Sequence, residues 1–301
     1  MSLTKILMIT FLLAISLNTN FAYSKDPDTL VFSFQKQKKP DELQAAADKM
    51  AEKLSLEIGK KVEILIPTSY SASVQGLISN KVQVAYMDSL PYVLASKEAD
   101  VEILAVEKRN GRTEYDSLIV VKKGSPITKL SDLKGKKMAF TSQTSTSGYL
   151  MPFSRLLIEK ELSTPQELDK YFTNILYAGG YDKALQSVIK GQTDAAAFSD
   201  YVIEGKKADL YGTVEDRNQV QVLARTSGVP THLIACRSDL SSALKKKIQA
   251  ALLKITKDEP ELLSSVYGAA ELVVPAQPKL HISRTLQALK DTGLDIKFFV
   301  K

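Results

Sequence analysis

The sequence has 301 residues, 44% of them hydrophobic and 25% charged, which is enough for one large globular domain or two of ordinary size. Its formal charge of +6 comes from dispersed lysines and arginines, and it contains no tryptophan. The basic stripe and the stacking platform typical of nucleic-acid-binding proteins are therefore both missing, and the charge supports only a general attraction for anions.

The first 24 residues have the pattern of a secretory signal peptide. Lys5 precedes the apolar run 6–17, and the small-residue pattern Ala22-Tyr23-Ser24 follows. The run is shorter than the roughly 20 residues that a helix needs to cross a bilayer. We therefore expect cleavage after Ser24, a soluble mature protein and a periplasmic location. An uncleaved run that acts as an anchor is the alternative.

The next part of the chain alternates short β-rich runs with helix-periodic segments. Within 41–58, for example, Leu43, Ala47, Met50 and Leu54 fall on one helix face. This alternation predicts a largely parallel sheet covered by helices. The expected strands are 30–34, 62–66, 82–87 and 101–106, and the expected helices are 41–58, 71–79 and 90–97.

A second series of the same kind begins near residue 137. The extended runs 116–121 and 220–226 are predicted to be the crossing strands of a hinge between two lobes, and helices near 241–256 and 262–270 to return to the first lobe. The predicted division is a signal peptide at 1–24, a discontinuous first lobe at 25–121 and 224–301, and a second lobe at 122–223. The strands expected in the second series are 137–140, 175–177 and 194–198, and its helices 148–161 and 181–190.

The two series resemble each other. The segments 64–70 and 175–181 share an apolar strand, a small-residue turn and a tyrosine that opens a helix, and at the same offset Asp88-Ser89 meets Ser199-Asp200. Chance identity between two amphipathic units is one explanation. A pseudo-symmetric pair of lobes is the better one, and it directs the carboxyl ends of the strands, where α/β sheets bind ligands, into a shared cleft.

A hydroxyl-rich stretch links a strand to a helix at 140–152. Six of the seven residues 141–147 are serine or threonine, and Pro152 fits only an early helical turn. Free N–H groups and the positive end of the helix dipole favour an anion there, and Gly148 permits close approach of the backbone. An ordinary N-cap is the alternative, but a single capping residue would suffice for it.

With these residues the chain resembles the phosphonate- and phosphite-binding proteins of bacterial ABC importers, over nearly the whole mature length. The resemblance implies an α/β fold of the type II periplasmic-binding-protein class, with two lobes, each a mainly parallel sheet flanked by helices, joined by two hinge strands. The matching motifs are Ser145-Thr146-Ser147-Gly148-Tyr149-Leu150 with Pro152, Gly180-Tyr181-Asp182-Lys183-Ala184 with Gly191 and Asp194-Ala195, Val229-Pro230, and Arg237-Ser238-Asp239-Leu240.

The resemblance also implies ligand contacts. It assigns the phosphoryl oxygens to Ser145, Thr146 and Ser147, and it places Tyr70 opposite them on the first lobe. Tyr92 resembles a second contact of that lobe, with a core tyrosine as the alternative, and Asp88 is a further candidate.

The chain departs from the family pattern at two positions. Tyr181 stands where many members have histidine, and Ser199, followed by Asp200, stands where many have aspartate. A carboxylate repels an oxyanion unless the ligand keeps a proton, which phosphoryl groups, with a second pKa near 6, are able to do. Asp200 would then select phosphorus species over sulfate. The alternatives are a helix cap for Asp200 and a packing role for Tyr181.

We therefore expect the substrate-binding protein of an ABC importer, specific for phosphite, methylphosphonate or a related small phosphonate, or phosphate. The expected partners are a permease and an ATPase, and the protein is expected to be a monomer that binds no nucleic acid. The alternatives are a secreted hydrolase and a stand-alone anion sensor.

An enzyme is not expected, because the sequence has no Gly-x-Ser-x-Gly elbow and neither His232 nor His281 has an evident carboxylate partner. Cys236 is the only cysteine, so no intramolecular disulfide can form. Two isolated histidines and one cysteine form no ligand-spaced cluster, and we expect no metal and no cofactor.

Overall fold

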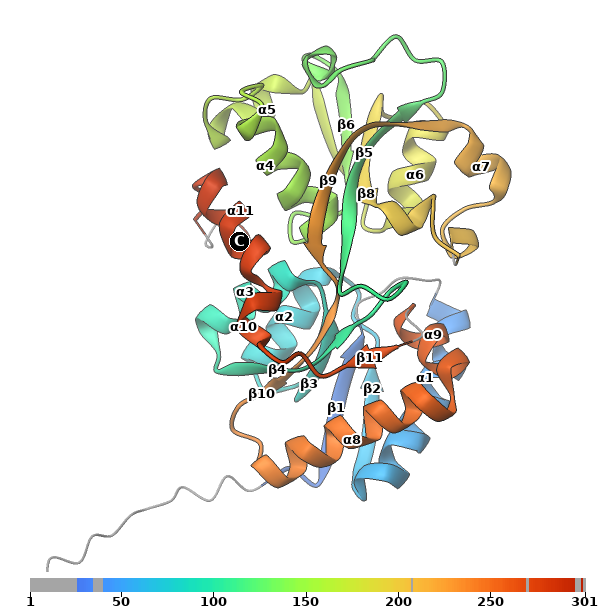
Figure 1. Ribbon diagram of the computed structural model, residues 1–301, viewed down its shortest axis with the longest axis vertical. Coiled ribbons are helices and arrows are strands. Elements are labelled where there is room, and N and C mark those ends of the chain that lie inside the picture. The colour runs from blue at the N-terminus through green and yellow to red at the C-terminus, as the bar shows by residue number, and fades with distance from the viewer. Residues whose placement is uncertain (1–25, 35–39, 207, 269–270, 296–298, 300–301) are drawn as a thin grey trace, which may run out of the picture.

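Two β-sheets organise the chain into two lobes that follow each other along its long axis (Figure 1). The computed structural model describes residues 26–34, 40–206, 208–268, 271–295 and 299. The predicted signal peptide, residues 1–24, lies outside these ranges. None of the helices within them is long and apolar enough to span a membrane.

The first lobe is built on a six-stranded sheet of order β11-β4-β10-β3-β1-β2. Strand β1 pairs in parallel with β2 and β3, whereas β10 runs antiparallel between β3 and β4. Its strands are β1 (Thr29–Phe34), β2 (Lys61–Leu65), β3 (Val84–Met87), β4 (Val101–Glu107), β10 (Leu233–Arg237) and β11 (Leu272–Val273). Its helices are α1 (Pro40–Ile58), α2 (Tyr70–Ile78), α3 (Ser89–Glu98), α8 (Ser242–Asp258) and α9 (Pro260–Tyr267).

The second lobe has a five-stranded sheet of order β7-β6-β8-β5-β9, in which β5 is antiparallel to both of its neighbours. Its strands are β5 (Glu114–Lys122), β6 (Lys137–Phe140), β7 (Asn174–Tyr177), β8 (Ala195–Ser199) and β9 (Val220–Pro230). Its helices are the π-helical turn η2 (Thr146–Leu150), α4 (Met151–Ile158), α5 (Leu168–Tyr171), α6 (Tyr181–Ile189) and α7 (Val214–Asn218). Short 3-10 turns are η1 (Leu130–Leu133), η3 (Pro165–Glu167), η4 (Asp200–Val202) and η5 (Ala208–Leu210).

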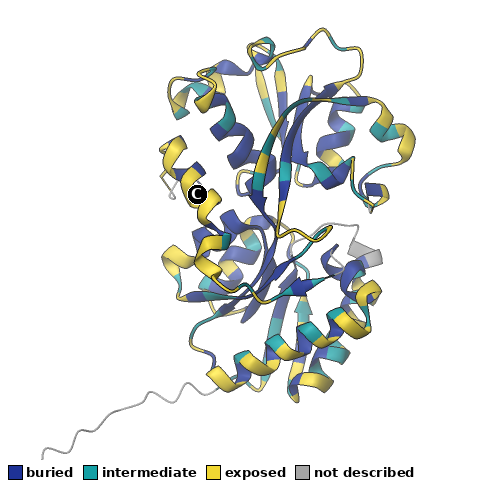
Figure 2. Cartoon of the chain, viewed as in Figure 1, coloured by how far each residue is buried: buried dark blue, intermediate teal, exposed yellow. Residues whose placement is uncertain are grey.

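Apolar periodicity explains how the helices pack. On α1, Ala47, Met50 and Leu54 are fully buried against α8, α9 and the first sheet. Burial of a side chain the size of leucine or methionine stabilises the fold by roughly 1.5–3 kcal/mol. Figure 2 shows the inner strands of both sheets as mostly buried, whereas β2, β7 and β9 have exposed residues, as do the outer faces of α8 and α11. The α/β fold class with two lobes is as predicted, but both sheets are mixed rather than mainly parallel, because β10 and β11 in the first and β5 and β9 in the second pair antiparallel to their neighbours.

The chain crosses between the lobes twice, from β4 to β5 through 108–113 and from β9 to β10 through 231–232. The predicted hinge runs are strands, but both are paired in the second sheet, so the predicted limits at 121/122 and 223/224 fall inside β5 and β9. Local sequence indicates an extended segment, whereas sheet membership depends on which distant strand pairs with it.

The C-terminal part divides between the lobes. Helices α8 and α9 pack on α1 as predicted, and α10 (Pro278–His281) then leads to α11 (Ser283–Thr292), which contacts α4, η2 and β9 as well as α3. In Figure 1, α11 lies beside α4. The aromatic ring of Phe299 lies 6.1 Å from that of Tyr149, in the second lobe. The predicted assignment of all of 224–301 to the first lobe therefore differs from the packing of α11.

Candidate functional site

The hydroxyl-rich turn connects β6 to η2 and α4. Ser145 precedes the helical turn, and its hydroxyl accepts a hydrogen bond of 3.1 Å from the N–H of Gly148. Ser145, Thr146 and Ser147 are all fully buried. The helical segment starts at Thr146, two residues before the predicted start, and Pro152 lies in the first turn of α4, where no N–H is required.

Gly148 is needed here because its backbone approaches the turn closely. The Thr141 N–H donates to the Gly148 carbonyl at 3.1 Å, and a Cβ on residue 148 would overlap the Thr141 side chain. The Thr141 hydroxyl in turn donates to the Ala197 carbonyl of β8 at 3.0 Å. Glycine thus allows the turn to lie directly against the ends of two strands.

The hydroxyl of Ser147 is the centre of a buried cluster in the second lobe. It lies 2.8 Å from the Ser199 hydroxyl at the end of β8, 3.0 Å from the Tyr181 hydroxyl at the start of α6, and 3.5 Å from the Tyr115 hydroxyl of β5. Ser117 donates to the Ser147 carbonyl at 2.6 Å. Burial raises the pKa of Tyr181 to about 12 and also raises the pKa of Tyr115 well above its ordinary value, so both phenols are neutral and able to donate at pH 7.

Thr146 joins the turn to the first lobe. Its N–H donates to Asp88 Oδ2 at 3.3 Å, and its hydroxyl accepts from the Leu90 N–H at 2.9 Å and lies 3.3 Å from the Ser89 hydroxyl. Asp88 immediately follows β3 and precedes α3. The start of α3 and the hydroxyl-rich turn therefore face each other across the boundary between the lobes.

A buried row of charges extends from Asp88 to the hinge. His232 Nε2 is paired with Asp88 Oδ1, and its Nδ1 lies 3.2 Å from Glu107 Oε2. Arg109 lies 2.5 Å from the other oxygen of Glu107. His232 belongs to the β9–β10 crossing, whereas Glu107 ends β4 and Arg109 belongs to the β4–β5 crossing.

The partners of His232 determine its charge. Burial lowers the pKa of His232, but the charges and hydrogen bonds of Asp88 and Glu107 outweigh burial and raise this pKa to about 9. For Glu107, burial raises the pKa, and Arg109 and His232 outweigh it, so that the pKa is lowered. At pH 7 the row therefore alternates negative and positive charges from Asp88 to Arg109.

Tyr92 and Tyr70 both lie in the first lobe. The Tyr92 hydroxyl donates to the Val101 carbonyl at 3.4 Å, and Val101 begins β4, at the end of the strand opposite to Glu107. Tyr92 thus packs within the first lobe, away from the turn. Tyr70 begins α2, after the carboxyl end of β2, and is buried there.

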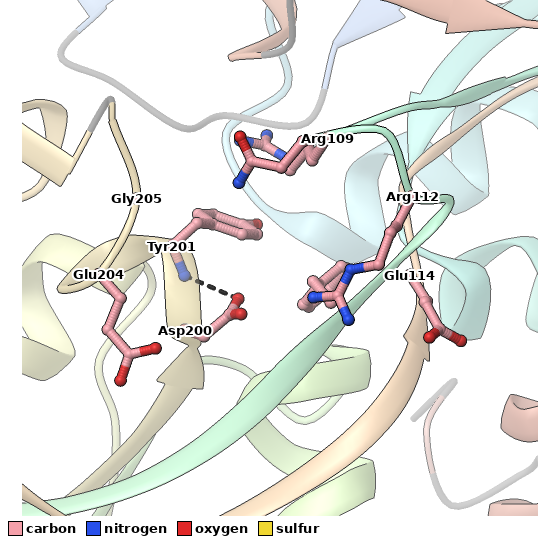
Figure 3. Close-up of a pocket in the computed structure, with 9 residues that line it drawn as sticks. Arg109, Arg112, Glu114, Asp200, Tyr201, Glu204 and Gly205 are labelled. Atoms are coloured by element: carbon pink, nitrogen blue, oxygen red, sulfur yellow. Dashed lines mark hydrogen bonds between the residues drawn. The ribbon is translucent and has the colours of Figure 1, made fainter.

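Asp200 lines a cavity of about 160 Å³ at the hinge, which Tyr115 of the Ser147 cluster also lines (Figure 3). Arg109 and Arg112 come from the β4–β5 crossing, and Asp200, Tyr201 and Glu204 from the segment after β8. Asp200 Oδ1 accepts the Tyr201 N–H at 2.8 Å, and burial, with a contribution from Asp116, raises the pKa of Asp200. Of the pair left open by the sequence, Ser199 therefore joins the Ser147 cluster, and Asp200 does not.

The rings of Tyr115, Tyr181 and Tyr201 pack together where the hinge cavity approaches the Ser147 cluster. The rings of Tyr115 and Tyr201 lie 5.3 Å apart, and those of Tyr181 and Tyr201 lie 5.9 Å apart. The Arg109 guanidinium lies 4.1 Å from the centre of the Tyr201 ring, a cation–π geometry that ties the hinge crossing to the second lobe.

Sequence reasoning missed four residues of this region: Tyr115, His232, Glu107 and Arg109. No carboxylate partner of His232 is evident from the sequence, because its two partners, Glu107 and Asp88, are 125 and 144 positions away. The sequence feature that could have indicated this row of charges is Glu107, a charged residue at the end of a largely apolar strand. Within the described ranges, no three His, Cys, Asp or Glu side chains are grouped so that they could hold a metal ion.

Comparisons with known proteins agree with this architecture. Residues 32–279 match the family model described as "ABC transporter, phosphonate, periplasmic substrate-binding protein". The chain is 27% identical over 188 residues to a phosphate-import protein of Mycolicibacterium smegmatis, covering 61% of this chain and 59% of that protein. It is also 27% identical over 209 residues to the phosphonates-binding periplasmic protein of Escherichia coli, covering 68% of this chain and 59% of that protein.

The chain thus spans about three fifths of the length of the curated relatives that it matches. Among solved structures, PhnD1 of Prochlorococcus marinus in complex with methylphosphonate superposes with a TM-score of 0.74 at 19% identity, covering 89% of this chain and 99% of that one. At this identity the likeness concerns the two-lobed fold. The match to the family model extends over most of the chain, and the protein belongs to the family of periplasmic substrate-binding proteins of phosphonate ABC transporters.

Proposed function

We propose that this protein is the substrate-binding component of an ABC importer and takes a small phosphorus oxyanion into the cleft between its lobes. The ligands proposed are phosphite, methylphosphonate or a related small phosphonate, and phosphate. The observation that carries the proposal is the buried cluster of Ser147, Ser199, Tyr181 and Tyr115 at the start of η2.

Hydroxyls at the start of a helical segment suit an oxyanion because they add donors to free N–H groups and cost no buried charge. The residues gathered here come from both lobes, since Asp88, Ser89 and Leu90 meet Thr146. A ligand at this place would be contacted from both sides, which favours closure of the lobes by hinge motion.

The family and the relatives support the same role. Delivery to a membrane transporter requires a permease and an ATPase as partners. Release of the exported chain into the periplasm requires the predicted signal peptide to be cleaved, which we expect after Ser24. We further propose that the mature protein acts in the periplasm as a monomer.

A hydrolase is less well supported. The close side-chain partners of the Ser147 hydroxyl are other hydroxyls, and His232 is engaged by Asp88 and Glu107. Nucleophilic catalysis by serine needs a base within hydrogen-bond reach. The arrangement therefore suits binding without chemical conversion.

Calorimetric titration of the mature chain tests the proposal. The ligands are phosphite, methylphosphonate, aminoethylphosphonate, phosphate and sulfate at about pH 7. We expect saturable binding of at least one of the small phosphorus oxyanions, with methylphosphonate or phosphite bound more tightly than sulfate. Tight binding of sulfate together with no response to any phosphorus oxyanion would refute the proposal.

A further inference from the structure

We propose that Asp88 is the residue by which this site distinguishes phosphorus oxyanions from sulfate and sulfonates. Its carboxylate accepts a hydrogen bond from a ligand that keeps a proton on oxygen, and it repels a ligand of the same shape that has none. The inference rests on the proposed function and assigns the selection to Asp88, where the sequence had suggested Asp200.

Asp88 lies beside the turn at which the oxyanion is proposed to bind. Its side chain is fully buried, and Oδ2 accepts the N–H of Thr146, one of the donors that the turn would offer to a bound oxyanion. Its charge also contributes, after burial, to the raised pKa of Tyr115 and Tyr181, whose hydroxyls contact Ser147. An oxyanion held by the turn and the Ser147 cluster must therefore lie next to the carboxylate.

The negative charge of the Asp88 carboxylate favours ligands that keep a proton. Two like unit charges about 4 Å apart in a partly screened protein environment repel each other enough to weaken binding by up to about a thousandfold. The protonated His232 paired with Oδ1 offsets part of this repulsion, so we expect a smaller effect for Asp88, of about tenfold or more. A proton on the ligand replaces this repulsion with a charge-assisted hydrogen bond. Phosphite and phosphonates, with a second pKa near 6 for a phosphoryl group, keep such a proton at modest cost, whereas sulfate and sulfonates have none to offer at neutral pH.

The buried row behind Asp88 holds the carboxylate in this orientation. His232 occupies Oδ1, and its ring is stacked on Tyr86 with 5.0 Å between ring centres, so that Oδ2 faces the turn. Glu107 holds the other nitrogen of the ring. His232 is therefore a positioning residue. Besides Glu107 and Arg109 within the row, the titratable groups that face it are Tyr86 of β3, Tyr115 of β5, Tyr181 of α6, Tyr201 of η4, Tyr211 after η5 and His281 of α10.

Proton uptake on binding is the decisive measurement. The mature chain is titrated with phosphite at about pH 8 in buffers that differ in ionisation enthalpy. Because free phosphite is then mostly a dianion, we expect wild-type protein to take up close to one proton per ligand, and its affinity to fall about tenfold from pH 7.5 to 8.5. Asp88→Asn removes the acceptor charge, so uptake should fall toward zero and affinity for methanesulfonate should rise at least about tenfold.

Asp200→Asn is the matched comparison, since it neutralises the carboxylate in the hinge cavity, and we expect it to retain the proton uptake. Tight binding of phosphite without proton uptake by wild-type protein would overturn the inference while leaving the proposed function intact. Loss of uptake in Asp200→Asn, but not in Asp88→Asn, would assign the selection to Asp200 and also overturn it. If no phosphorus oxyanion binds, the proposed function itself fails. Should Asp88→Asn not fold, as judged by thermal melting, absence of proton uptake in the wild type or its loss in Asp200→Asn would still overturn the inference.

Discussion

The hydroxyl oxygens of Ser147 and Ser199 lie 2.8 Å apart, although 52 residues separate them in the sequence. Ser147 belongs to the helical turn after β6, and Ser199 is the last residue of β8, the strand that pairs in parallel with β6. The carboxyl ends of these two neighbouring parallel strands therefore lie at the same edge of the second sheet, where the Tyr181 hydroxyl also contacts Ser147.

Replacement of Ser147 by alanine should weaken binding of methylphosphonate by about tenfold to a hundredfold, because a hydrogen bond to a charged group contributes roughly 1.5–3 kcal/mol. Titration calorimetry measures this change. Ser142→Ala is the control, since that hydroxyl contacts Thr144 within the same loop, and its loss should leave the affinity nearly unchanged. Equal affinities of Ser147→Ala and wild-type protein would argue against the cluster as the ligand site.

Gly148→Ala should destabilise the second lobe by about 1–3 kcal/mol, the usual cost of forcing an extra group into a packed site. The added methyl group would overlap the Thr141 side chain, which is fixed by the hydrogen bond of its hydroxyl to Ala197. Urea denaturation of the variant and the wild type measures the difference. An unchanged midpoint would show that the turn relaxes around the methyl group.

The pair of His232 with Asp88 should make stability depend on alkaline pH. The pKa of His232 is about 9 in the fold, above the ordinary histidine value of 6.5. The protonated ring therefore stabilises the fold fully below about pH 6.5, and this contribution, on the order of 3 kcal/mol, is lost as the pH rises through 9. Denaturation midpoints measured from pH 6 to 10 should fall over this window in the wild type and stay flatter in His232→Gln.

His281→Gln provides the comparison for that series. Burial lowers the pKa of His281, whose Nε2 lies 2.9 Å from the Thr231 carbonyl oxygen. A lowered histidine pKa destabilises the fold as the pH falls through the unfolded value near 6.5. His281→Gln should therefore change the acidic side of the stability profile and preserve its alkaline decline. The opposite pattern in the two variants would contradict both assignments.

Thr285 should tie α11 to the first lobe. Its hydroxyl lies 2.6 Å from that of Ser89, and both side chains are fully buried. Thr285→Val keeps the shape and removes this link, leaving the Ser89 hydroxyl with one partner fewer, and should cost about 1–3 kcal/mol in thermal-unfolding experiments.

Thr292→Val is the matched control for that link, because the Thr292 hydroxyl donates to the Leu289 carbonyl within α11. Small-angle scattering with and without methylphosphonate should show a larger shift toward open lobes for Thr285→Val than for Thr292→Val. Identical scattering profiles of the two variants would show that the Thr285 link of α11 plays no part in closure of the lobes.

The main features of the fold were predictable because each depends on local patterning. The apolar face of α1, with Ala47, Met50 and Leu54, and the alternation of strands with helices indicate helix-covered sheets wherever they occur. The hydroxyl-rich turn was recognisable for the same reason, since its residue types, Gly148 and Pro152 are adjacent in the sequence. Tyr181 and Ser199 followed from a motif and from the internal comparison of the two series.

The hinge and the C-terminal helix were not predictable to the same extent. Strands β5 and β9 read as extended segments, but their membership of the second sheet depends on pairing with each other and with β8. The amphipathic pattern of α11 shows that one face is buried. It does not show that this face packs against both α4 of the second lobe and α3 of the first. Such choices depend on the competition among distant surfaces.

The fold class and the family are evident from the sequence alone, and the hydroxyl-rich turn is a candidate oxyanion site, because these depend on periodicity and on contiguous residues. Which side chains meet at the turn depends on the tertiary structure. In the folded chain Asp88 contacts Thr146, and His232 is buried between Asp88 and Glu107. Asp200 lines the hinge cavity instead, and Tyr92 bonds to Val101 within the first lobe. Buried charges are retained only where opposite charges and hydrogen bonds offset their desolvation, and those partners come from strand ends that no local pattern connects.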